Sequence, residues 1–361
     1  MKRYDNDIHA ILMRLQHITG ATNEMADSWL SRWEQPHRFY HTLDHLFELK
    51  RLFGAQWDER DDLFLLAVFH DIVYDPRAQD NELRSKELFL KQLPEKFKEA
   101  NPTVVDEIAK AIMESKHDVK PETELGKLFC PADLRILTHS NLDELIAYEI
   151  KLSKEYQVYP YGLYRTHRIQ FLSNWISANP LIEDLIKFIK YRKINIGLYV
   201  GSFDPFTIGH QNILEKAERI FDKVVICRGL NPAKDDWSFK LPPCLDYHQK
   251  LYVGNLRHVR EELAPMEQRE KHMAALLLHD PSITLIRGLR GGMDLDMEKL
   301  QQIYIQQMMG EVKMNTVYIT CDREFEHISS TAFKQVAKVD METAATLCPN
   351  GFPTVPINDF V

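Results

Sequence analysis

The chain has 361 residues, and at about 150 residues per domain this length predicts two or three domains. Hydrophobic residues make up 44% and charged residues 27%, which excludes a disordered chain and a collagen-like repeat. The 53 acidic residues outnumber the 45 basic ones and give a net charge of -8. Such a chain binds nucleic acid or an anionic membrane poorly unless it has a local basic pocket.

The sequence shows no pattern typical of a membrane span or a signal peptide. The longest strongly apolar run, residues 63–69, is far shorter than the ~20 residues that a membrane span needs. The charged start of the chain has no apolar segment behind it, so we expect no signal peptide. The five cysteines show neither zinc-finger nor redox spacing and are expected to be reduced. We therefore predict a cytoplasmic protein that has neither nucleic acid nor a membrane as partner.

The first half of the chain, residues 1–190, is predicted to be all-helical. Proline and glycine punctuate the gaps between helical segments, and no β-rich hairpin is visible. The segments with helical periodicity are 8–18, 46–53, 63–69, 104–113, 142–152 and 163–176. A basic stretch at 188–193 is the predicted linker to the second half.

The pattern changes near Lys190. An apolar run at 194–200, a helical stretch at 211–221 and a second apolar run at 224–227 predict a βαβ unit with parallel strands. Further strands are expected at 282–286 and 316–320, a helix opening at Ser329, and an irregular tail from Cys348. The fold class is thus multidomain, with an all-α domain at 1–190 and an α/β parallel-sheet domain at 191–361.

Histidines and aspartates gather in the helical half. His41 and His45 are four residues apart, on one face if that segment is helical, and His70 and Asp71 follow the apolar stretch 63–69. An unpaired charge at the edge of a core is costly, and a divalent cation held by imidazole and carboxylate removes that cost. The alternative is a hydrogen-bonded His–Asp pair without metal. The candidate ligands are His45, His70, Asp71 and Asp133, with His41 and His117 as further candidates.

Three motifs extend this pattern: Tyr-His-Thr-Leu-Asp-His at 40–45, His-Asp-Ile-Val-Tyr-Asp-Pro at 70–76 and Asn-Glu-Leu-Arg-Ser at 81–85. With Asp133 they resemble the HD superfamily of metal-dependent phosphohydrolases, over nearly all of residues 1–190. The resemblance implies that the four candidate ligands hold a divalent transition metal such as Mn²⁺, Fe²⁺, Co²⁺ or Ni²⁺. It also implies hydrolysis of a phosphate ester by metal-bound water. The substrate stays open, as does a first half without catalysis.

The segment 201–210, Gly-Ser-Phe-Asp-Pro-Phe-Thr-Ile-Gly-His, joins the first predicted strand of the second half to a helix. A turn of small residues lets backbone N–H groups face a phosphate, and the helix N-terminus adds its positive end. His210 at the helix start can hydrogen-bond an oxyanion. A plain βα turn with a capping histidine is the alternative.

Three later segments strengthen the phosphate interpretation: Asn-Pro-Ala-Lys at 231–234, Arg-Gly-Leu-Arg at 287–290 and Ile-Ser-Ser-Thr at 328–331. Each is expected at the carboxyl edge of the sheet, where parallel α/β sheets bind ligands. Paired guanidinium groups suit phosphate, and the hydroxyls can cap a helix or bind phosphate oxygens. Four such signals in succession predict one shared phosphate site.

In this order the four segments resemble the phosphopantetheine adenylyltransferases of the nucleotidylyltransferase superfamily, over residues 193–340. Thr207 and the segment 287–290 favour this branch over the nicotinamide mononucleotide adenylyltransferases. The resemblance implies a Rossmann-like sheet that uses ATP with Mg²⁺. It also implies that Lys234 and Arg287 hold the acceptor phosphate with Ser202, and that His210 and Arg290 complete the catalytic set. The implied ATP-binding residues are Ser202, Phe203, Gly209, His210, Gly288, Leu289, Arg290, Glu298, Phe325, Ile328, Ser329, Ser330 and Thr331.

The sequence also departs from that family. Ile208 stands where family members usually have Asn, a longer insertion occupies 235–265, and the segment 235–279 is rebuilt. The hypothesis is a bifunctional enzyme that makes dephospho-CoA from 4'-phosphopantetheine and hydrolyses a phosphate ester. The alternatives are another acceptor, such as nicotinamide mononucleotide, or a nucleotide-sensing module that controls the hydrolase. The family is commonly hexameric, so a homo-oligomer is a further expectation that the extra domain could block.

Overall fold

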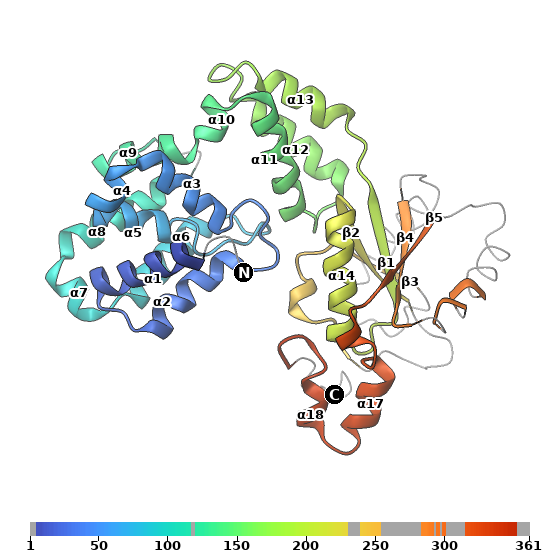
Figure 1. Cartoon of the computed structure of the whole chain (residues 1–361). Coiled ribbons are helices and arrows are strands. Elements are labelled where there is room, and N and C mark those ends of the chain that lie inside the picture. The colour runs from blue at the N-terminus through green and yellow to red at the C-terminus, as the bar shows by residue number, and fades with distance from the viewer. Residues whose placement is uncertain are drawn as a thin grey trace. The chain divides into compact units, whose positions relative to one another are not determined.

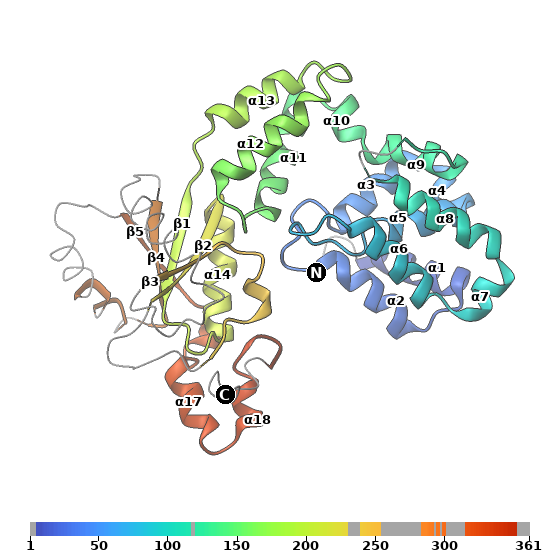
Figure 2. The same cartoon turned by 180° about the vertical axis from the view of Figure 1, so that it is seen from behind.

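The computed structural model of the chain describes residues 5–116, 120–229, 239–253, 283–291, 294–296, 298–300 and 315–351. The chain divides into two compact units, drawn in Figures 1 and 2. The helical unit comprises Met1–Tyr156 and Tyr164–Lys190, and the sheet unit comprises Gln157–Leu163 and Tyr191–Val361. Among the described residues, no helix is both long enough and apolar enough to cross a bilayer.

The helical unit contains α-helices and short 3₁₀ turns in its described residues, as the sequence predicted. The predicted linker at 188–193 is wrong in its first four residues, which form the end of α13, because that helix buries an apolar face that includes Leu185 and Ile189. The α-helices are α1 (Asp5–Thr19), α2 (Asn23–Leu30), α3 (Leu43–Phe53), α4 (Ala55–Glu59), α5 (Asp61–Phe69), α6 (Asn81–Gln92), α7 (Glu95–Ala100), α8 (Pro102–Glu114), α9 (Glu124–Asp133), α10 (Arg135–His139), α11 (Leu142–Glu155), α12 (Tyr161–Ser173) and α13 (Ile182–Tyr191).

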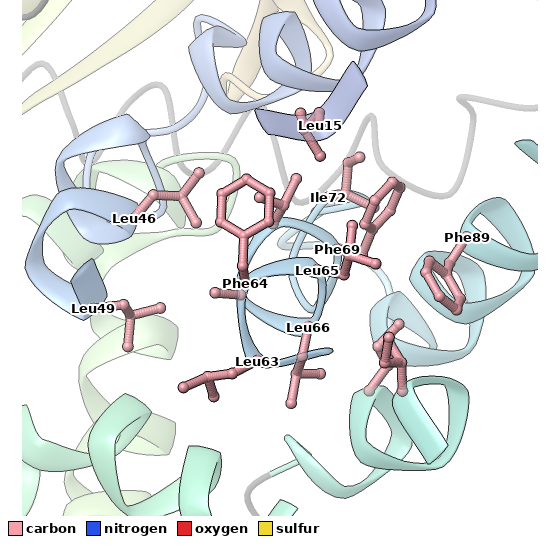
Figure 3. Packing of buried hydrophobic residues seen from close by; sticks show 14 of the residues in the cluster. Leu15, Leu46, Leu49, Leu63, Phe64, Leu65, Leu66, Phe69, Ile72 and Phe89 are labelled. Atoms are coloured by element: carbon pink, nitrogen blue, oxygen red, sulfur yellow. The ribbon is translucent and has the colours of Figure 1, made fainter. Parts of the chain in front are cut away.

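The core of the helical unit is built around α5. Every side chain from Leu63 to Phe69 has 0% exposure, so this helix is apolar all round rather than amphipathic. Figure 3 shows Leu15, Leu46, Leu49 and Phe89 around it. Each large apolar side chain buried in this way contributes roughly 1.5–3 kcal/mol of transfer free energy. This packing fixes the C-terminal end of α5, from which the chain continues into the predicted His-Asp motif.

The sheet unit has a five-stranded sheet in the order β3-β2-β1-β4-β5, with all neighbours parallel. The strands are β1 (Ile196–Gly201), β2 (Lys223–Gly229), β3 (Lys250–Val253), β4 (Ile283–Leu289) and β5 (Asn315–Thr320). The prediction of a parallel sheet is confirmed. The sequence analysis missed β3, a four-residue edge strand inside the segment interpreted as an insertion.

The order of the strands also locates a switch point. The chain runs from β1 to β2 and β3 on one side and returns to β4 and β5 on the other. In sheets of this kind the crevice at the carboxyl ends of the two central strands, here β1 and β4, is where ligands bind. The helix α14 (Ile208–Ile220) follows β1 and packs on the sheet, while α17 (Ser330–Ala337) and α18 (Met341–Ala345) lie side by side (Figures 1 and 2).

Candidate functional site

His210 lies in the first turn of α14, directly after the loop that leaves β1. The buried Thr207 caps this helix, and its backbone N–H donates to His210 Nδ1 at 3.0 Å. Because a backbone amide can only donate, Nδ1 must carry the lone pair, and the proton of the neutral ring is on Nε2. Burial, and then the nearby Arg290 guanidinium, lower the pKa of His210 to about 4. At pH 7 this side chain is therefore a neutral donor through Nε2.

The loop before α14 is packed by aromatic rings. Phe203 and Phe206 are both 1% exposed, and their ring centroids lie 5.3 and 5.5 Å from that of His210. Phe203 has a φ of 45°, in the left-handed region that a bulky residue rarely adopts. Ser202, at the start of the loop, is half-buried and its carbonyl accepts a hydrogen bond from Arg228. The imidazole of His210 is thus held on one side by Thr207 and on the other by two rings.

The segment at 328–331 lies against the start of α14. A Cβ atom on Gly209 would lie 3.4 Å from the Ile328 carbonyl oxygen and 3.7 Å from that of Phe325, so the first turn of α14 is within van der Waals contact distance of this backbone. Ser330 Oγ donates to the Pro205 carbonyl at 2.8 Å. Ser329 Oγ instead accepts from the Ala332 N–H at 3.0 Å and caps α17, so this hydroxyl has a structural role.

The carboxyl end of β4 also meets α14. A Cβ atom on Gly288 would lie 3.1 Å from Ile213 Cγ1 and 3.4 Å from the Tyr199 hydroxyl, and Leu289 beside it is buried. Tyr199 OH in turn lies 3.4 Å from the His210 carbonyl oxygen. The ends of β1 and β4 therefore close on the first turn of α14, at the switch point of the sheet.

Both arginines of the segment 287–290 have carboxylate partners. Arg287 Nε donates to Glu298, so two predicted ligand-binding residues contact each other. Arg290 makes two parallel bonds to the Asp294 carboxylate, each of 3.0 Å, and its side chain is 49% exposed. Arg290 is near enough to lower the pKa of His210, and an exposed guanidinium can exchange its carboxylate for a phosphate.

Some predicted residues do not join this constellation. Lys234 lies outside the described residues, and Thr331 is exposed next to the cap of α17. The sequence analysis missed Asp294 and Arg228. The signal for Asp294 was its spacing of four residues from Arg290, and the signal for Arg228 was a single arginine directly after the apolar run 224–227.

A second constellation lies in the helical unit. His45 on α3, His70 after α5 and Asp133 at the end of α9 offer ligand atoms that all lie within 4.8 Å of one another. His45 Nε2 is 3.0 Å and His70 Nε2 3.6 Å from Asp133 Oδ1. Both imidazoles are buried, with 4% and 1% exposure. Three residues from segments far apart in the sequence thus form a compact set of metal-ligand type.

The donor atoms of this set fit a metal ion. His70 Nδ1 lies 2.9 Å from the Ala67 carbonyl, which only accepts, so Nδ1 carries the proton and Nε2 faces the cluster. That Nε2 atom is buried and has no hydrogen-bond partner among the residues that the structure describes. A buried ring nitrogen that lacks a hydrogen bond and lies beside a carboxylate is suited to bind a metal ion.

The charges around His70 also favour a cation at this cluster. Asp71 Oδ2 lies 3.4 Å from His70 Nε2 and 3.7 Å from His41 Nε2. Burial alone lowers the pKa of His70, but the Asp71 carboxylate and then Asp133 outweigh it and raise this pKa to about 9. Burial opposes ionisation of Asp71, yet the neighbouring imidazoles hold its pKa well below the usual range. These surroundings favour positive charge, so the residues present fit a divalent transition metal.

His41 is positioned by a residue that the sequence analysis missed. His41 precedes α3, so the condition under which it would share a helical face with His45 is not met. This residue is Glu155, which lies at the end of α11 and is 0% exposed. Its Oε2 accepts hydrogen bonds from His41 Nδ1 and from the Tyr74 hydroxyl, both at 2.7 Å. Its Oε1 accepts the backbone N–H groups of 39–41 at 2.7–2.8 Å. No local signal marks Glu155, because its partners are more than 80 residues away; His117 lies outside the described residues.

Comparison with known proteins bears on the sheet unit. Residues 198–336 match the family described as cytidylyltransferase-like. The phosphopantetheine adenylyltransferase of Streptococcus pneumoniae (strain Hungary19A-6) is 31% identical over 149 residues, which cover 41% of this chain and 87% of that protein. The enzyme of the same description from Streptococcus sanguinis is 29% identical over 150 residues, 42% of this chain and 87% of that protein. The phosphopantetheine adenylyltransferase of Fusobacterium nucleatum is 28% identical over 144 residues, which cover 40% of this chain and 83% of that protein.

Through its sheet unit, the chain belongs to the phosphopantetheine adenylyltransferase family. The adenylyltransferase relatives match less than half of the chain, and the family match at 198–336 contains none of the cluster of His45, His70 and Asp133. The parallel sheet and the loops around α14 are therefore the part of the molecule that the family explains.

Proposed function

We propose that the sheet unit transfers the adenylyl group of ATP to 4'-phosphopantetheine and releases pyrophosphate, which gives dephospho-CoA. The observation that carries this proposal is the meeting of the β1 loop, the β4 end and the start of α17 around the first turn of α14. A neutral His210 with its Nε2 proton available stands at that point. The family to which the sheet unit belongs supports the same activity.

The reaction needs no nucleophile from the protein. An oxygen of the acceptor phosphate attacks the α-phosphorus of ATP, the bond from that phosphorus to the bridging oxygen breaks, and pyrophosphate leaves. Positioning and charge stabilisation carry the rate. On this proposal His210 donates from Nε2 to an α-phosphate oxygen, and Arg290 turns from Asp294 to the triphosphate. Arg287, with Lys234, holds the acceptor phosphate. Magnesium that enters with ATP neutralises part of the charge on the triphosphate.

The test is a pyrophosphate-release assay on the full chain with ATP and Mg²⁺. The acceptors are 4'-phosphopantetheine, nicotinamide mononucleotide and buffer alone. We expect turnover with 4'-phosphopantetheine and none without acceptor. If only nicotinamide mononucleotide gave turnover, it and not 4'-phosphopantetheine would be the acceptor. ATP binding without turnover on either acceptor would favour a nucleotide sensor.

We infer a second activity for the helical unit, the hydrolysis of a phosphate ester with a divalent metal. The observation behind it is the buried Nε2 of His70, which has no hydrogen-bond partner in the described part of the chain and lies 3.4 Å from an Asp71 oxygen and 3.6 Å from an Asp133 oxygen. On this proposal His45, His70, Asp71 and Asp133 hold the metal, which supplies Lewis acidity and an activated water when bound. Glu155 orients His41 at the edge of the same centre.

The experiment starts with protein that has been stripped of metal by a chelator and dialysed. Mn²⁺, Co²⁺ or Ni²⁺ is added back, and bound metal is measured by elemental analysis before phosphatase activity is measured on a general aryl phosphate. We expect about one ion per chain and activity that depends on it. Absence of bound metal under all three conditions would remove the centre, while bound metal without hydrolysis would leave a structural or regulatory ion.

A further inference from the structure

Arg228 lies beneath the loop that leads from β1 into α14. It is the residue of β2 that pairs in register with Gly201, the last residue of β1, and it is only 3% exposed. Its Nε donates to the Ser202 carbonyl at 3.1 Å, and one Nη donates to the Phe203 carbonyl at 3.5 Å. The same Nη donates to the Phe239 carbonyl at 2.5 Å. A buried guanidinium therefore contacts two successive carbonyl groups of the loop.

These two carbonyls enclose the strained residue of the loop. Phe203 has a φ of 45°, which an aromatic side chain adopts only where its surroundings hold it. The Ser202 carbonyl belongs to the peptide before Phe203, and the Phe203 carbonyl belongs to the peptide after it. In a trans peptide the N–H points away from the C=O. With both carbonyls on Arg228, the N–H groups of Phe203 and Asp204 face away from the guanidinium, in the manner of an anion-binding nest.

The charges below the loop have one dominant sign. The Asp204 carboxylate, 1% exposed, accepts the Phe239 N–H at 2.9 Å and lies 3.6 Å from Arg228. Its other oxygen accepts from Lys334 on α17. Among the described residues, these two cations and one carboxylate give a net positive charge on this side of the loop. A positive charge attracts phosphate. If Arg228 did not hold the carbonyl groups of Ser202 and Phe203, their oxygens could turn toward a triphosphate and repel it.

We propose that Arg228 is a positioning residue for ATP: it holds the carbonyls of Ser202 and Phe203 so that the amides of this loop are presented to the triphosphate. The inference rests on the proposed adenylyltransferase function of the sheet unit. Arg228 acts through the loop and not by contact with the nucleotide, because it is buried and its guanidinium donates to three backbone carbonyls.

The test compares Arg228→Met and Arg228→Lys in the full chain. The dissociation constant of ATP with Mg²⁺ is measured by calorimetry, and the KM values of ATP and of 4'-phosphopantetheine are measured separately. Loss of the guanidinium should raise the dissociation constant and the KM of ATP by about 10- to 100-fold, the range that a misplaced binding group produces. The KM of the acceptor should change by less than about twofold. The dissociation constant of ATP for Arg228→Lys should lie between those of the wild type and Arg228→Met, because an ammonium group keeps the charge but lacks the planar fork of a guanidinium.

The matched control is Arg168→Met. Arg168 is also a buried arginine, paired with Glu149 at 2.9 Å in the helical unit, so its loss tests whether destabilisation alone weakens ATP binding. We expect this variant to bind ATP like the wild type. Folded Arg228 variants with wild-type ATP affinity would overturn the inference, as would failure of both to fold or an equal rise in both KM values. If the wild type itself does not bind ATP, the proposed function fails instead.

Discussion

His210 in the sheet unit is half-buried and His70 in the helical unit is buried, and their pKa values shift in opposite directions. Burial and Arg290 lower the pKa of His210 to about 4. For His70 burial acts in the same sense, but Asp71 and Asp133 overcome it and raise the pKa to about 9. The difference lies in the neighbours, because desolvation alone would make both imidazoles neutral.

This contrast separates a candidate site for anions from a candidate site for a cation. Around His210 the groups are backbone amides, a helix N-terminus and a guanidinium, which suit the phosphates of a nucleotide. Around His70 they are two carboxylates and a second imidazole, which suit a divalent metal. The same residue type thus serves as a neutral hydrogen-bond donor in one unit and as a metal-ligand candidate in the other. Four predictions test the comparison.

The largest effect is expected at His210. His210→Ala removes the hydrogen-bond donor that we propose for the α-phosphate, so pyrophosphate release should fall by about 10²- to 10³-fold while the fold is kept. Stopped assays of pyrophosphate and a thermal melt measure the two quantities. His167→Ala, an exposed histidine of the helical unit, is the control and should behave as the wild type. Near-normal turnover of the first variant would defeat the role given to His210.

The second effect concerns the cation site. Asp71→Ala removes the carboxylate nearest to His70 Nε2, so the metal measured by elemental analysis should drop to background after dialysis. Asp75→Ala is the matched control, since Asp75 lies four residues later and its carboxylate is bound to Arg77 at 2.8 and 2.9 Å. It should keep the metal. Equal metal content in both variants would show that Asp71 is no ligand.

The third prediction concerns the carboxylate that orients His41. Glu155→Gln replaces an acceptor of five hydrogen bonds by a group that must donate with its amide, so some donors lose their partner. The free energy of unfolding should fall by about 2–4 kcal/mol. Glu144→Gln, exposed on the same helix α11, should cost less than ~0.5 kcal/mol. Urea unfolding of both variants measures this difference, and similar losses would argue against a special role for Glu155.

The smallest expected effect is the pH dependence of His210. Its pKa is near 6.5 in the unfolded chain and about 4 in the folded one, so between these values the unfolded chain binds the extra proton. Stability is therefore lost as the pH falls, by about 2 kcal/mol between pH 7 and pH 5. Urea unfolding at the two pH values should show this loss in the wild type and not in His210→Gln. Parallel changes in the two proteins would contradict the assigned pKa.

Much of the sheet unit could be predicted from the sequence because its signals are local. The apolar runs that became β1, β2, β4 and β5 are short and continuous. Segment 201–210 leads from the end of β1 into α14, segment 287–290 covers the end of β4, and segment 328–331 leads into α17. A parallel sheet places all carboxyl ends at one edge, so the order of the motifs already indicates where they meet. β3 escaped prediction because a four-residue edge strand carries too little pattern.

The sequence by itself determined the two classes of unit, the apolar helix α5 and the residue types of both sites, since periodicity and turn chemistry depend on near neighbours. Only the tertiary structure decided which groups face one another. Glu155 reaches His41 across 114 residues, and Arg228 reaches Ser202 from the neighbouring strand. The charge states of His210 and His70 were likewise decided by the fold, through burial and Arg290 for the first and through Asp71 and Asp133 for the second. Packing sets them, because the pKa of a buried group responds to the atoms that surround it in space, whether or not these are near it along the chain.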